Sequence, residues 1–222
     1  MAKENLKPVL KFLKDLEANN NREWFQDNKK RFEDAKQTFE AFVDGIIEDF
    51  SLVEDLGGIR AKSCLFRIYR DVRFSKNKSP YKTNMGASIS REGRRSSLPP
   101  YYLHIQPNNE SFIAGGLYMP EPKRLAGFRE AIAENSTDFK KILNSSKFKE
   151  YYGTPDGEKL KTAPRGFAKD HPEIELLRLK HVTVMHRVND NDVTSDTFHK
   201  MVVKGFTIQQ PFIHYLSQFN RD

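Results

Sequence analysis

A run of arginines with interleaved aromatic residues is the part of this sequence best suited to chemistry. It reads Phe-Arg-Ile-Tyr-Arg-Asp-Val-Arg-Phe-Ser-Lys-Asn-Lys-Ser-Pro-Tyr-Lys-Thr from Phe66 to Thr83. Guanidinium groups hold planar oxyanions through paired hydrogen bonds, and lysines add mobile positive charge. We therefore expect these residues to form an anion-binding site: Arg67, Tyr69, Arg70, Asp71, Arg73, Lys78, Tyr81 and Lys82.

The spacing within the run suggests how the site would be arranged. If the chain is extended as far as Phe74, alternate residues lie on opposite faces. The core face would carry Phe66, Ile68, Val72 and Phe74, with Arg70 among them, and the other face Arg67, Tyr69, Asp71 and Arg73. Asp71 would then orient the guanidinium groups beside it, while Tyr69 or Tyr81 would contact the organic part of a ligand.

The positive charge of the chain is confined to this region. The whole chain of 222 residues has 37 Lys and Arg against 30 Asp and Glu. The segment from Arg60 to Arg95 contains eleven of those bases and only two acids, so the remainder is slightly acidic. A concentrated field of this kind raises the local concentration of anions.

Three interpretations of the basic run remain open. The first is binding of a phosphorylated or otherwise anionic small molecule. The second is a nucleic-acid-binding module, in which the bases follow a phosphate backbone and the aromatic residues stack on nucleobases. The third is a structural network of arginines that pins loops and carboxylates. Convergence of the charged groups on a solvent-filled hollow would favour the first interpretation.

Several motifs together resemble the bacterial domain of unknown function 2461 family. They are Asn20-Asn21-Arg22-Glu23-Trp24-Phe25, Arg67 to Phe74, Lys78 to Thr83, Pro164 to Phe167 and Asp170-His171-Pro172. The resemblance covers almost the whole chain and implies a cytoplasmic, single-domain protein. It brings no assigned activity and no catalytic residues, so no reaction is assigned.

The hydropathy pattern predicts an α+β fold, with an N-terminal helical hairpin and C-terminal helices packed on a mostly antiparallel sheet. We expect one domain over 1–222, comprising a helical hairpin (1–58), a strand-rich basic segment (59–120) and a mainly helical remainder with one further strand (121–222). Asn20 and Glu23 have capping-box spacing and would start one long helix that ends at Gly57-Gly58. Strands are expected from Cys64, at Met85–Ile89, at Tyr101–Ile105, over Ser111–Met119 and at Val182–Val188.

Other candidate sites are weaker. The six histidines lack metal-ligand spacing, and Cys64, the only cysteine, lies in an apparent core strand, so we expect neither a metal nor a cofactor. Gly115-Gly116 indicates a β-bulge, or a point where a ligand approaches the backbone. No apolar stretch is long enough to cross a membrane and no signal peptide is apparent, so we expect a cytoplasmic protein without membrane contact.

Overall fold

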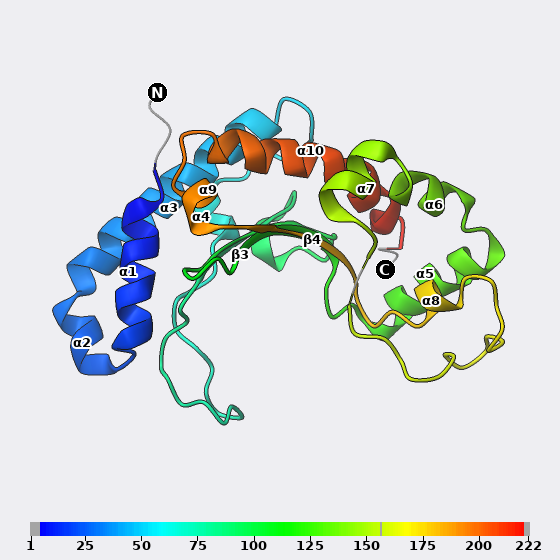
Figure 1. The fold of residues 1–222 in the computed structure, drawn as a ribbon, viewed down its shortest axis with the longest axis horizontal. Coiled ribbons are helices and arrows are strands. Elements are labelled where there is room, and N and C mark those ends of the chain that lie inside the picture. The colour runs from blue at the N-terminus through cyan, green and yellow to red at the C-terminus, as the bar shows by residue number, and fades with distance from the viewer. Residues whose placement is uncertain (1–4, 156, 220–222) are drawn as a thin grey trace.

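The computed structural model describes residues 5–155 and 157–219 and has the predicted α+β architecture (Figure 1). The helices are α1 (Lys7–Ala18), α2 (Arg22–Asp27), α3 (Lys29–Phe50), α4 (Ala61–Cys64), α5 (Pro122–Glu134), α6 (Thr137–Leu143), α7 (Ser146–Tyr152), α8 (Ile174–Leu177), α9 (Asp190–Val193) and α10 (Phe198–Ser217), with a 3-10 turn η1 (Gly93–Arg95). The strands are β1 (Met85–Ile89), β2 (Tyr101–Ile105), β3 (Ser111–Leu117) and β4 (Val182–Val188).

The four strands form one antiparallel sheet in the order β1-β2-β3-β4, which confirms the predicted meander. β1 pairs with β2 from Met85↔Ile105 to Ile89↔Tyr101. β4 returns after the C-terminal helices and pairs with β3, from Ser111↔Val188 to Leu117↔Val182. This β3–β4 register runs one to one through Gly115 and Gly116, so the bulge prediction was wrong for this pair.

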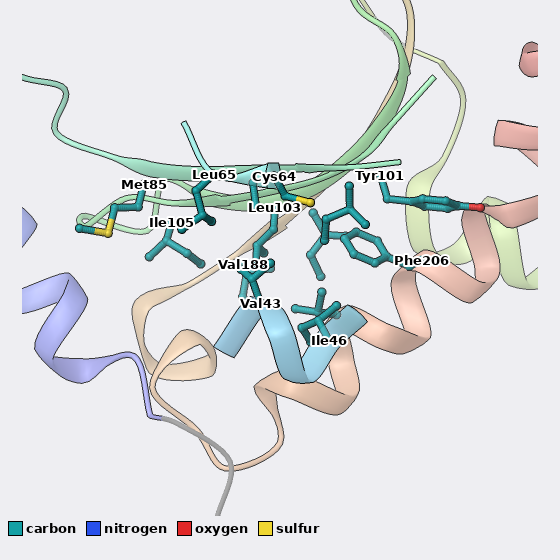
Figure 2. Close-up of a cluster of buried hydrophobic side chains, with 14 of the residues drawn as sticks. Val43, Ile46, Cys64, Leu65, Met85, Tyr101, Leu103, Ile105, Val188 and Phe206 are labelled. Carbon is teal, nitrogen blue, oxygen red and sulfur yellow. The ribbon is translucent and has the colours of Figure 1, made fainter. Parts of the chain in front are cut away.

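The hydrophobic core lies between one face of the sheet and helices α3 and α10 (Figure 2). Leu103 and Tyr101 of β2 point toward Val43 of α3 and Phe206 of α10. The ring centroids of Tyr101 and Phe206 are 5.3 Å apart. Full burial of a large apolar side chain such as Leu103 or Phe206 stabilises the fold by about 1.5–3 kcal/mol. The helices on this face therefore hold the sheet rigidly.

The long helix predicted after Asn20 is divided at Asn28. The Asn28 side-chain amide donates to the Trp24 carbonyl at 2.9 Å and its oxygen accepts from Arg31. Asparagine side chains compete with the helix in this way. The cap of α2 is Asn21, whose side chain accepts from the Trp24 backbone N–H at 2.9 Å, not Asn20.

The strand predicted to start at Cys64 was wrong. Ala61–Cys64 is a single helical turn, and the Ala61 backbone N–H donates to Asp44 at 2.9 Å. The chain beyond it is irregular, with isolated bridges Leu65↔Ala87 and Tyr69↔Tyr81. A strand needs a continuous face to bury, whereas Arg70 interrupts the apolar positions of this run. We call residues 66–84 the basic loop; it projects away from the sheet on the side opposite α10 (Figure 1).

Candidate functional site

The basic loop is anchored at its base by the N-terminal helices. Asn20 makes two hydrogen bonds to the Tyr81 backbone, one from its amide to the carbonyl at 3.0 Å and one from the Tyr81 N–H at 3.1 Å. The buried Tyr81 ring stacks on Phe25, with centroids 3.9 Å apart, and burial raises its pKa. Tyr81 is thus held as part of the core. Two residues of the Asn20–Phe25 motif make these contacts, so the motif anchors the loop.

The charged residues predicted for the site lie along this loop with different partners. Arg73 forms a two-point ion pair with Asp71, at 2.6 and 3.0 Å, and this pair lowers the pKa of Asp71. Arg70 donates to the Ser75 hydroxyl at 3.3 Å. Lys78 donates to the Val72 carbonyl at 3.0 Å. Each of these side chains therefore has a local partner within the loop.

The aromatic residues of the loop are not arranged as predicted. Phe74 is 96% exposed and Phe66 43% exposed, so neither belongs to the core, while Ile68 is buried. Tyr69 is half-exposed and lies beside Tyr81, with centroids 5.5 Å apart. None of the eight predicted residues lines the main pocket beside the sheet.

A pocket of about 640 Å³ lies instead on the sheet face opposite the helices, and we call it the sheet pocket. Because side chains alternate along a strand, Tyr102 and His104 point away from the core that holds Tyr101 and Leu103. Phe112 of β3 and Met185 of β4 complete the floor. Gly115 and Gly116 also line it, and a Cβ on either would lie within 3 Å of protein atoms, 2.7 Å from the Pro100 carbonyl and 2.2 Å from the Val182 carbonyl respectively. Close packing within the protein therefore accounts for both glycines, and the approach of a ligand stays a prediction.

The floor of the sheet pocket carries a hydrogen-bonded chain with a defined direction. The Gln106 amide donates to Glu110, so its carbonyl oxygen must accept from Nε2 of His104, 2.8 Å away. Nδ1 of His104 is then unprotonated and accepts from the Tyr102 hydroxyl at 3.1 Å. The carboxylate thus fixes the tautomer of the histidine through the amide.

Packing fixes the orientation of the two rings in this hydrogen-bonded series, those of Tyr102 and His104. His104 stacks on Phe112 at 4.3 Å and 9°, and the hydroxyl of Tyr102 lies over Gly86, where a Cβ would be 2.5 Å from it. Burial raises the pKa of Tyr102 to about 12. Burial also lowers the pKa of His104, with Lys82 acting in the same direction and Gln106 and Glu110 against it. Near neutral pH the pair therefore consists of a phenol and a neutral imidazole.

Two arginines, Arg94 and Arg124, line the sheet pocket, and Lys82 lies next to one of its lining residues. The side chain of Arg124, in the first turn of α5, is half-buried, and its guanidinium makes no hydrogen bond or ion pair within residues 5–155 and 157–219. Burial lowers its pKa, with Glu121 opposing. At another edge Lys82 lies 5.4 Å from the ring centroid of Phe66, a lining residue. Burial lowers the pKa of Lys82, and Arg67 lowers it further.

One edge of the sheet pocket is strained. Met119 has φ 47° although it is not glycine, and its backbone N–H donates to Nδ1 of His181 at 3.0 Å. Tyr118 and Met119 are 72% and 70% exposed. Backbone conformations of this kind persist where the surroundings impose them, often beside binding sites.

Only a weak signal for this pocket is present in the sequence. The outward positions of a half-covered antiparallel sheet are normally polar, yet β2 and β3 carry Tyr102, His104 and Phe112 there. In the described part of the chain, no group of three or more His, Cys, Asp or Glu could hold a metal ion. Within the same residues no helix is long and apolar enough to cross a membrane.

Comparison with known proteins yields a match that extends over most of the chain and is not limited to the residues of this pocket. Neither the curated proteins nor the solved structures contain a match. A family model described as "Conserved hypothetical protein (DUF2461)" matches residues 8–215, which is most of the chain and includes both the basic loop and the sheet pocket. The chain therefore belongs to the DUF2461 family of conserved hypothetical proteins.

Proposed function

We propose that the protein binds a small organic anion in the sheet pocket. The observation that carries the proposal is Arg124, a half-buried guanidinium that borders an apolar pocket and has no anionic partner within hydrogen-bonding distance among the described residues. Burial lowers the pKa of Arg124 and the nearby Glu121 offsets this only in part, so a ligand oxyanion would supply the hydrogen-bonded partner that the guanidinium lacks.

The floor of the pocket indicates the rest of the ligand. Aromatic and aliphatic side chains, among them Tyr102, Phe112 and Met185, offer a flat apolar surface, and the volume is within the range of small-molecule sites. The Tyr102 hydroxyl and Asn84 lie beside Nδ1 of His104, where a polar substituent could exchange hydrogen bonds with them. The preferred ligand is therefore a planar, largely apolar molecule with a phosphate or carboxylate group.

Part of the predicted basic site also contributes to this proposal. Lys82 is close enough to His104 to lower its pKa, and Arg67 acts on Lys82 in turn. These two residues would raise the local concentration of anions at one edge, while Arg124 holds the oxyanion at another.

Calorimetric titration with phenyl phosphate, benzoate, inorganic phosphate and benzyl alcohol tests the proposal. We expect the two aromatic anions to bind more tightly than either the inorganic ion or the neutral alcohol. Arg124→Gln should weaken that binding by about tenfold or more, because hydrogen bonds to charged groups contribute about 1.5–3 kcal/mol. Lys123→Gln removes the same charge from the neighbouring exposed position and should have little effect.

Equal affinities of the wild type and Arg124→Gln would overturn the proposal. Preference for benzyl alcohol over both aromatic anions would do the same. Arg124→Lys separates charge from geometry, because an ammonium group keeps the charge and loses the planar fork.

A further inference from the structure

The tip of the basic loop exposes an aromatic ring almost completely. Phe74 is 96% exposed, more than the other large hydrophobic residues exposed in the described chain. Tyr69, on the same loop, is 51% exposed. Figure 1 shows that the loop projects away from the sheet and its helices, so a large partner could reach both rings.

The charge around these rings is only slightly neutralised. Residues 67–82 contain six Lys and Arg and one acid, Asp71, which is committed to Arg73. Arg67 and Lys76 make no hydrogen bond or ion pair with another residue of the described ranges. The loop therefore presents a strongly positive surface, and its partner should be a polyanion.

The base of the loop is rigid although its tip is exposed. Backbone hydrogen bonds join Lys82 to Ile68 at 2.8 Å and Arg70 to Pro80 at 2.9 Å. The two Asn20 bonds and the Tyr81–Phe25 stack fix this stem to α2. A fixed stem lowers the entropic cost of binding through the tip.

We propose that the basic loop binds single-stranded nucleic acid. Phe74 stacks on one base and Tyr69 on another, while Arg67, Arg70, Lys76 and Lys78 neutralise phosphates. Rings interleaved with cations suit a single strand, whose bases and phosphates alternate on the same scale. This inference is independent of the sheet pocket and of Arg124.

The alternative polyanion, an acidic lipid surface, fits these observations less well. The Arg73 guanidinium lies 5.9 Å from the Phe74 ring centroid and Lys76 is two residues away. Inserting one ring into the acyl region would bring these charges toward an apolar medium, at a cost that one phenylalanine does not offset. A ring stacked on a base leaves the same charges beside phosphates.

Fluorescence anisotropy with labelled oligothymidylate and oligouridylate tests the inference, and sedimentation with phosphatidylglycerol vesicles tests the alternative. Phe74→Ala should weaken oligonucleotide binding by about five- to 150-fold, the equivalent of about 1–3 kcal/mol per stacked base. Phe74→Trp should keep the affinity and Phe74→Leu should lose it, because leucine is apolar but cannot stack. Leu52→Ala is the matched control, since Leu52 is 84% exposed on another surface.

The salt dependence tests the phosphate contacts separately. The slope of log affinity against log salt should decrease by about 0.7 in Lys76→Gln, as expected for one phosphate contact to a single strand. Lys36→Gln, which removes an exposed lysine from α3, should leave the slope unchanged.

Absence of oligonucleotide binding at low salt, or wild-type affinity in Phe74→Leu, would overturn the inference, and so would vesicle binding that Phe74→Leu retains. Arg124→Gln should bind oligonucleotides as the wild type does, so failure here and failure of the small-anion proposal are distinguishable.

Discussion

At the scale of single residues, the position of one carboxylate determines which nitrogen of a distant histidine carries a proton. Glu110 orients Gln106, and Gln106 in turn requires a proton on Nε2 of His104. The electron pair on Nδ1 consequently accepts a hydrogen bond from the Tyr102 hydroxyl beside the sheet pocket. A ligand that donates a hydrogen bond or a proton to this nitrogen must therefore compete with the Tyr102 hydroxyl.

The same residue predicts a pH dependence of stability. Burial lowers the pKa of His104 below its ordinary value of about 6.5, so the unfolded chain binds this proton more readily than the folded one. The stability contributed by neutral His104 is complete above pH ~6.5 and is lost as the pH falls through the lower folded pKa. Urea unfolding of the wild type and of His104→Gln should show this difference.

The informative quantity is the difference in unfolding free energy between the two proteins. We expect it to decrease between about pH 7.5 and about pH 5, by at most about 1.4 kcal/mol per pH unit. Taking the difference cancels the other titrating groups, provided that they are unaffected by the substitution. A difference that stays constant over this range would show that His104 titrates alike in both states.

At the scale of elements, the alternation and the helical spacing of apolar residues predicted the strands and helices that bury one continuous face. β1, β2 and β4 lie where the alternation of apolar residues placed them. The apolar stripe did not reveal the division between α2 and α3, because Asn28, three residues after Phe25 and four before Phe32, lies on the same face and ends α2 through its side chain. The basic loop resembled a strand because Phe66 and Phe74 were counted as core residues.

The stem of the basic loop provides the prediction at this scale. Asn20→Ala removes both hydrogen bonds to the Tyr81 backbone and should lower the free energy of unfolding by about 1–3 kcal/mol. Trypsin should then cut faster at Arg70, Arg73, Lys76 and Lys78, as mapped by mass spectrometry. Asn19→Ala is the control, because the Asn19 amide bonds only the neighbouring Asp15 carbonyl. Equal cleavage rates in both variants would contradict a clamping role for Asn20.

At the scale of the whole molecule, the candidate site was harder to predict than the fold. The sheet pocket combines Tyr102 and His104 of β2 with Arg124 of α5, and the sequence alone does not show which face of the sheet the helices leave open. The basic run was visible because its residues are contiguous. Contiguous charge identifies a surface, whereas a pocket depends on elements that meet only after folding.

Glu54 joins three distant parts of the fold and supplies the prediction at this scale. Its carboxylate accepts from the Tyr101 hydroxyl at 2.8 Å and from the Gln210 amide at 2.8 Å, and it lies 2.9 Å from Nε2 of His214. The Tyr101 side chain is buried, and burial together with Glu54 raises its pKa. Loss of this carboxylate therefore leaves a buried hydroxyl without its acceptor.

Glu54→Ala should consequently lower the free energy of unfolding by about 2–4 kcal/mol, measured by urea denaturation. The neighbouring Asp55 pairs with Arg91 at 3.3 Å, and both side chains are more than 60% exposed. Asp55→Ala should therefore cost about 1 kcal/mol or less, as exposed ion pairs do.

Because Glu54 connects β2 and α10 with the segment after α3, its loss should weaken the whole core, so circular dichroism and tyrosine fluorescence should report one shared transition. Separate transitions in Glu54→Ala would indicate that the sheet and α10 unfold independently, and equal costs for the two variants would place Glu54 among ordinary surface carboxylates.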